Sequence, residues 1–236
     1  SIYHVPISYY NQGLDQQVCK HFNLNIDDKP DLSRWTNINK IQETSEGTVN
    51  IGIVGKYTSM VDAYKSLNEA LKHGGLQNQL KININYIDSE TLNRNNVKEL
   101  LEVSHAVLVP GGFGERGIEG MILAAEYARV NKVPYLGICL GLQVAVIEFA
   151  RNVLNLKDAN SSEFKQDTKN PIIGLIHEWK KDGKIIKGTN VDLGGTMRLG
   201  LYDAILKKNS LISKIYSAKK IQERHRHRYE VNLKYK

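Results

Sequence analysis

The chain has 236 residues, a length that allows one sizeable hydrophobic core with an appendage. Its apolar share of 41% is ordinary, and no apolar run approaches the roughly 18–20 residues of a membrane-spanning helix. The start of the chain lacks the features of a signal peptide, and two cysteines, Cys19 and Cys139, make no disulfide framework. We therefore expect a cytoplasmic protein with no membrane segment. Because no Cys/His cluster has zinc-ligand spacing, we also expect no bound metal.

The net charge of +7 raises the question of an anionic partner. Basic residues are scattered except in the run 223–229, Glu-Arg-His-Arg-His-Arg-Tyr. As a nucleic-acid patch this run is short and no aromatic-rich motif accompanies it, so we predict no nucleic-acid partner. An anion-binding segment inside a site explains the run at least as well, and a solvated charged run is a third interpretation.

Residues 1–45 differ from the rest of the chain. Residues 14–22 favour a short helix, residues 23–30 form a polar loop, and residues 43–47 are typical of a linker. The segment is too small to hold a core of its own, so we interpret it as the tail of a larger unit.

From Thr48 onward, strand and helix patterns alternate. The expected strands are 49–55, 81–87, 105–109 and 133–136, and the expected helices include 96–101, 119–130 and 142–150. A further helix is capped by Asp62 and ended by Gly74, with an apolar face of Ala63, Leu67, Ala70 and Leu71. This order predicts an α/β fold with a doubly wound, mostly parallel sheet flanked by helices. After residue 171 the segments 172–176, 183–188 and 191–199 predict a small region of short antiparallel strands.

The run 137–141, Gly-Ile-Cys-Leu-Gly, lies between a predicted strand and a predicted helix. A cysteine flanked in this way sits on a tight turn where small neighbours are needed, as in a nucleophile elbow. The following helix N-terminus would favour the thiolate of Cys139. A packed structural cysteine is the alternative, because free cysteine is among the most buried residue types.

A second glycine-rich turn, residues 110–114 (Pro-Gly-Gly-Phe-Gly), follows the strand at 105–109. Carboxyl ends of parallel strands gather on one edge of a sheet, where α/β proteins build their sites. Paired glycines let backbone N–H groups approach a ligand closely, as an oxyanion hole requires. The alternative is a turn that merely joins strand to helix.

Taken together, these runs closely resemble the CTP synthase family, in its glutamine amidotransferase half with the end of the synthase half attached. The elbow and the glycine turn are shared by all class I glutamine amidotransferases, which implies a flavodoxin-like fold. The runs 192–200 and 223–231 are specific to CTP synthases. Residues 1–45 would then be the tail of the synthase domain with a linker, and residues 46–236 the amidotransferase domain.

The resemblance implies that glutamine is hydrolysed through a thioester on Cys139, and that the ammonia aminates ATP-activated UTP to CTP. The backbone amides of Gly111 and Leu140 match the oxyanion hole. The positions that match glutamine-binding residues are Gly112, Phe113, Leu140, Gly141, Leu142, Gln143, Glu163 and Arg228. Among them, Glu163 would hold the α-amino group and Arg228 the α-carboxylate, a pairing that suits a guanidinium.

The family also implies an allosteric activator, GTP, whose matching positions here are Lys65, Lys187 and Thr189. Lys56 serves that region or supports the turn after the first strand. The sites for ATP, UTP and Mg²⁺ belong to the synthase domain, which this sequence lacks. The other implied partners are that synthase domain and, in the whole enzyme, three further copies in a homotetramer.

One departure concerns the family's catalytic Phe-His-Pro-Glu motif, which this sequence does not contain. The domain 46–236 is therefore expected to be C-terminally incomplete and crippled in turnover, because general acid–base assistance is typically worth about 10²–10⁴-fold. His177 is the other histidine considered as a base, and a structural role suits it better. An alternative function is a catalytically weak module that senses glutamine and GTP. A γ-glutamyl hydrolase is a third possibility, which the CTP-synthase-specific runs disfavour.

Overall fold

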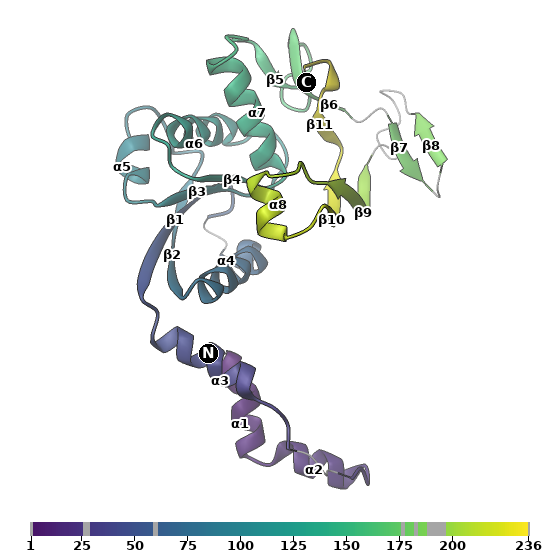
Figure 1. Cartoon of the computed structure of the whole chain (residues 1–236). Coiled ribbons are helices and arrows are strands. Elements are labelled where there is room, and N and C mark those ends of the chain that lie inside the picture. Colours follow the sequence, from purple (N-terminus) through teal and green to yellow (C-terminus); the bar gives the residue numbers. More distant parts are fainter. Residues whose placement is uncertain are drawn as a thin grey trace.

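The computed structural model describes residues 2–25, 29–58, 61–175, 178–181, 184–187 and 197–235. At its centre lies a four-stranded parallel sheet with the strand order β2-β1-β3-β4 (Figure 1). The strands are β1 (Gly47–Gly55), β2 (Leu80–Asp88), β3 (Ala106–Val109) and β4 (Tyr135–Gly137). The predicted α/β fold with a parallel sheet flanked by helices is confirmed.

The apolar side chains of the sheet alternate between two faces, as the period of a strand dictates. Ile51, Ile53 and Leu108 lie in one cluster, whereas Val54 and Val107 lie in the other. Each face therefore needs its own cover of helices, which is why strands and helices alternate along the chain.

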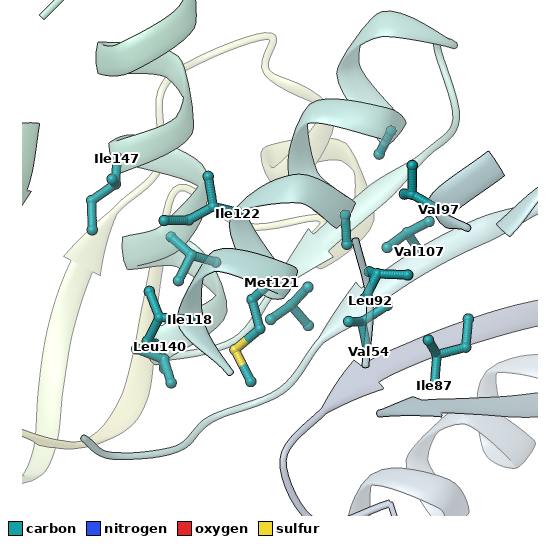
Figure 2. Close-up of a cluster of buried hydrophobic side chains, with 14 of the residues drawn as sticks. Val54, Ile87, Leu92, Val97, Val107, Ile118, Met121, Ile122, Leu140 and Ile147 are labelled. Atoms are coloured by element: carbon teal, nitrogen blue, oxygen red, sulfur yellow. The ribbon is translucent and has the colours of Figure 1, made fainter. Parts of the chain in front are cut away.

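The larger cluster fills the space between the sheet and three helices (Figure 2). These helices are α5 (Val97–Leu101), α6 (Ile118–Val130) and α7 (Leu140–Asn152). Met121 of α6 and Ile147 of α7 are at most 1% exposed, and α7 begins with the equally buried Leu140. Burying each such side chain contributes about 1.5–3 kcal/mol, so this packing fixes the start of α7 against the sheet.

Helix α4 (Lys65–Gln77) covers the opposite face through Leu67 and Leu71. The expected ends of this helix were wrong. Asp62 lies in the 3₁₀ turn η2 (Val61–Tyr64) and caps nothing, since Tyr64 occupies the N-cap position. The helix also continues past Gly74, because the adjacent Gly75 packs so closely on β2 that a Cβ there would lie 2.6 Å from the Leu80 carbonyl oxygen. This glycine serves close packing, and the helix ends at Gln77 with Asn78 as its C-cap.

Beyond the central sheet, short strands form three small sheets. One combines β5 (Ala159–Ser161), β6 (Asn170–Leu175) and β11 (Tyr229–Val231), with β11 antiparallel to β6. The other two are antiparallel pairs, β9 (Arg198–Ile205) with β10 (Lys220–His227) and β7 (Glu178–Lys181) with β8 (Lys184–Lys187). The predicted antiparallel region is thus present, although residues 191–196 of the expected strand 191–199 and His177 lie outside the described residues. A short helix, α8 (Leu211–Tyr216), connects β9 to β10.

The N-terminal segment extends away from the sheet and its helices (Figure 1). It contains η1 (Ile2–His4), α1 (Val5–Asn11), α2 (Leu14–His21) and α3 (Ser33–Glu43), of which only α2 was predicted. Tyr3 is the one buried apolar side chain among the described residues before β1. It donates a hydrogen bond to Glu69 of α4 at 3.2 Å. Across the described part of the chain, no helix is long and apolar enough to span a membrane.

Candidate functional site

The carboxyl ends of β1, β3 and β4 meet at one edge of the parallel sheet. Lys56 follows β1, the glycine turn 110–114 follows β3, and Cys139 follows β4. The two predicted turns do converge, because a Cβ atom added at Gly111 would lie 3.4 Å from Cys139 Cβ and 4.0 Å from its Sγ. This edge is where open α/β sheets bind their ligands.

Cys139 occupies a sharply strained turn. Its φ of 54° and ψ of −105° lie in a region that non-glycine residues rarely adopt, and such strain clusters at functional sites. The flanking glycines are required sterically. A Cβ atom at Gly137 would overlap the backbone of Gly141, and a Cβ atom at Gly141 would overlap the carbonyl oxygen of Val109. The nucleophile elbow expected from the sequence is therefore present.

The protonation of the Cys139 thiol differs from the expectation. Although part of the residue faces solvent, desolvation of the thiol by its surroundings raises the pKa of Cys139 above its usual value. The Leu140 backbone hydrogen bond at the helix start lowers this pKa by a smaller amount, and the Glu163 carboxylate raises it. The helix N-terminus acts on the thiol in the predicted direction, but desolvation outweighs this one backbone bond, so the pKa of Cys139 is raised overall.

A small cavity of about 80 Å³ opens beside the cysteine. Its lining residues come from four separate segments of the chain: Gly112, Phe113, Cys139, Gln143, Glu163, His227, Arg228 and Tyr229. Opposite charges therefore face one cavity, with the Glu163 carboxylate from the turn after β5 and the Arg228 guanidinium from the bend between β10 and β11. One guanidinium nitrogen, Arg228 Nη1, is buried without a hydrogen-bond partner among the described residues. A buried donor left unpaired costs about 1–3 kcal/mol or more, so it marks a place for an anionic ligand group.

Three of the predicted site residues, Leu140, Gly141 and Leu142, do not line the cavity with their side chains. Leu140 is 1% exposed in the core, so its backbone amide is the part that meets Cys139. Gly141 packs against β3, and the Leu142 side chain is 55% exposed outside the cavity lining. Gln143, one residue further along α7, lines the cavity, and a role for Leu142 in substrate binding stays a prediction.

Of the three residues matched to GTP, only Lys65 has a described side chain. Lys65 is exposed at the start of α4. Lys187 ends β8, its side chain is not described, and Thr189 lies outside the described residues. The GTP site remains a prediction. The described residues also contain no group of three or more His, Cys, Asp or Glu side chains that could hold a metal ion.

Sequence reasoning missed His227 as a cavity residue. Its Nδ1 lies 3.1 Å from the Tyr229 carbonyl oxygen, which can only accept, so Nδ1 carries the proton. Its Nε2 then accepts from His225 Nδ1 at 2.9 Å. Both ring nitrogens are engaged, and the Tyr229 oxygen also accepts from Gln143 Nε2 at 3.0 Å. The period of two in the run 223–229 is the signal that places both histidines on one face of β10.

Acid is expected to weaken the fold through this histidine pair. Burial is the main cause that lowers the pKa of His227, and the nearby charges of His225 and Arg198 act in the same direction. The Tyr229 carbonyl and Glu230 oppose them. Because the unfolded chain then binds this proton more readily, the free energy of unfolding should fall as the pH drops below about 6.5.

Urea unfolding at a series of pH values between 5 and 8 measures this effect. The substitution His227→Gln should flatten the decline below pH 6.5, while both proteins run parallel above pH 7.5. An equally steep decline in the variant would show that the histidine pair carries none of the acid sensitivity.

Comparison with known proteins agrees with this geometry. Residues 59–236 match the family model described as glutamine amidotransferase class-I. The strained Cys139 turn and the charged cavity beside it both lie within the matched residues. The chain belongs to the class I glutamine amidotransferase family.

Within that family, the similar proteins are CTP synthases. The chain is 56% identical to the CTP synthase of Pelagibacter ubique and 54% identical to that of Zymomonas mobilis. All of the chain aligns in both cases, but it spans 44% of the length of each relative. Among solved structures, it resembles the glutaminase domain of Trypanosoma brucei CTPS with bound acivicin, with a TM-score of 0.67 and 40% identity. That match covers 79% of this chain and 69% of the other.

Proposed function

We propose that this chain binds L-glutamine in the cavity beside Cys139 and hydrolyses it to glutamate and ammonia. The observation that carries the proposal is the unpartnered guanidinium of Arg228 in the same cavity as the Glu163 carboxylate and the cysteine. These two charges complement an α-amino acid, with its carboxylate on Arg228 and its ammonium on Glu163. Acivicin, bound in the Trypanosoma brucei relative, supports a glutamine-like ligand.

The reaction follows from these positions. Cys139 Sγ attacks the side-chain carbonyl carbon of glutamine, and its proton leaves with the amide nitrogen as ammonia. The tetrahedral oxyanion lies near the backbone amides of Gly111 and Leu140, each worth about 3 kcal/mol when aimed at the developing charge. Water then cleaves the thioester, releasing glutamate and restoring the thiol.

His227 is not the base in this scheme, because both its nitrogens are already hydrogen-bonded. Its role is to hold the bend that carries Arg228. The family's catalytic histidine and glutamate lie in a motif that this sequence does not contain. A covalent adduct at Cys139 reports the attack by the nucleophile directly, and it serves as the readout in the experiments that follow.

The proposed use of the ammonia is inferred from the CTP synthase relatives. In the whole enzyme, it would displace phosphate from UTP activated by ATP with Mg²⁺, in a synthase domain outside this chain. GTP as an activator, the homotetramer and the cytoplasm are parts of the same proposal. The N-terminal segment, whose described residues include three α-helices and one buried apolar side chain, suits a tail that packs on such a domain.

Treatment with 6-diazo-5-oxo-norleucine, an electrophilic glutamine analogue, tests the proposal. Intact-mass measurement should show one adduct, with a mass increase equal to the mass of the analogue less that of N₂. The thiol proton is transferred to the diazo carbon, and the sulfur bonds to that carbon as N₂ leaves. The adduct should map to Cys139, and excess L-glutamine should slow its formation.

The second cysteine provides the matched control. Cys19 lies on α2, remote in sequence and fold from the elbow. Cys19→Ala should label like the unsubstituted chain, and Cys139→Ala should not label at all. An adduct on Cys19, or labelling that glutamine does not slow, would count against a glutamine site.

A further inference from the structure

The peptide between Phe113 and Gly114 is held from two opposite sides. Lys56 Nζ donates a 2.8 Å hydrogen bond to the Phe113 carbonyl oxygen and a second bond to that of Gly114. The Gly114 N–H donates to Glu163 Oε1 at 2.9 Å. In a trans peptide, the C=O and N–H of one plane point in opposite directions. Lys56 and Glu163 therefore bind opposite edges of the same peptide group. Lys56 binds its carbonyl oxygen, and Glu163, on the cavity side, accepts from its N–H.

Lys56 does not line the cavity. It is only 5% exposed, which is unusual for a lysine. Its ammonium donates hydrogen bonds to the two loop carbonyls in place of the bonds to water that burial removes. Glu163, in contrast, lines the cavity and uses one carboxylate oxygen on Gly114. Among the described residues, no hydrogen bond involves the second carboxylate oxygen, so it is available to a ligand.

We propose that Lys56 is a positioning residue that fixes the Phe113–Gly114 peptide and thereby presents the Glu163 carboxylate to the ammonium group of the substrate. The inference rests on the proposed function, since it names the residue that sets ammonium recognition in that site. Lys56 acts through the peptide plane. Without it, the peptide rotates, the Gly114 N–H leaves Glu163, and the carboxylate loses its orientation.

The charges around Lys56 agree with this arrangement. Burial lowers the pKa of Lys56, and the adjacent Arg116 guanidinium acts in the same direction. The carboxylates of Glu163 and Glu90 raise it. Attraction between the Lys56 ammonium and the Glu163 carboxylate therefore supplements the hydrogen bonds that hold the peptide.

The substitution Lys56→Met, made in a Cys19→Ala background, separates this role from general support of the fold. Two alkylating probes are compared at Cys139: 6-diazo-5-oxo-norleucine, which carries an ammonium, and iodoacetamide, which does not. We expect saturable binding of the first to weaken about 10-fold, while the rate with iodoacetamide changes by less than twofold. Lys72→Met is the matched control, because it makes the same change at an exposed lysine of α4 and should alter neither reaction.

Combination with Glu163→Gln gives a second readout. If Lys56 acts through Glu163, the double variant should lose no more affinity than Glu163→Gln alone, whereas independent sites would add. Additive losses, unchanged binding in Lys56→Met, or a parallel fall with both probes would each overturn the proposal.

If Lys56→Met does not fold, hydrogen exchange of the Gly114 amide in the unsubstituted chain still tests whether this amide is held by Glu163. The amide should exchange slowly, and Glu163→Gln should accelerate it; free exchange in the unsubstituted chain would overturn the proposal. Failure of the proposed function is a distinct outcome, because the unsubstituted chain would then form no glutamine-protected adduct at Cys139 before any substitution at Lys56.

Discussion

Replacing Arg228 with methionine should weaken binding of 6-diazo-5-oxo-norleucine about 100-fold. Arg228 Nη1 is buried and has no partner among the described residues, and in the proposed complex it would pair with the ligand carboxylate. Truncating one partner of a buried, hydrogen-bonded charge pair costs about 2–5 kcal/mol, and each 1.4 kcal/mol is tenfold in affinity. The concentration dependence of Cys139 labelling measures this affinity.

The unliganded protein should respond in the opposite way. Because the unpaired guanidinium is a cost in the free state, Arg228→Met should leave the free energy of urea unfolding unchanged or higher. Arg226→Met is the matched control, since Arg226 is exposed on β10 two residues away. It should change binding by less than twofold. Equal effects at both positions would mean that the basic run attracts the ligand only by its general charge.

Replacing Gly141 with alanine should lower the free energy of unfolding by about 3 kcal/mol or more. The added Cβ would overlap the Val109 carbonyl oxygen, a backbone atom in the middle of the core that cannot move aside. Overpacking a well-packed core typically costs about 1–3 kcal/mol, and a clash with backbone belongs at the upper end. Guanidinium unfolding followed by circular dichroism measures the change, and Cys139 labelling should be lost with the displaced elbow.

Gly74→Ala is the matched control for this substitution. Gly74 is exposed within α4, and a Cβ atom there would meet nothing within 4 Å. Alanine should therefore stabilise the helix by about 0.5–1 kcal/mol. If Gly141→Ala were as well tolerated as Gly74→Ala, the close approach of α7 to β3 would not be a requirement of the fold.

Local patterns in the sequence were sufficient to predict the parallel sheet, the helices that flank it and the elbow at Cys139. Alternating strands and helices implied parallel strands, and the glycines around Cys139 implied a bend with no room for side chains. Element ends were less predictable. Gly74 and Gly75 suggest a helix end in isolation, whereas packing of Gly75 on β2 carries the helix three residues past Gly74.

The protonation of Cys139 depended on the surroundings rather than on the motif. A helix N-terminus lies next to this thiol as expected, but desolvation by burial raises the pKa of Cys139 overall. Lys56 is a comparable case. From the sequence, Lys56 could either contact GTP or support the turn after the first strand. Only the fold shows that its ammonium binds the carbonyl oxygens of Phe113 and Gly114.

The sequence by itself therefore determined the family, the parallel sheet and the cysteine on its strained turn, because these depend on residues close together in the chain. The tertiary structure decided how the cavity is assembled. Glu163 and Arg228 are 65 positions apart, and they face one cavity because β11 pairs with β6 and the chain bends at Arg228, after the alternation of β10 ends. Strand pairing and desolvation arise from contacts between remote segments, and no local pattern specifies them.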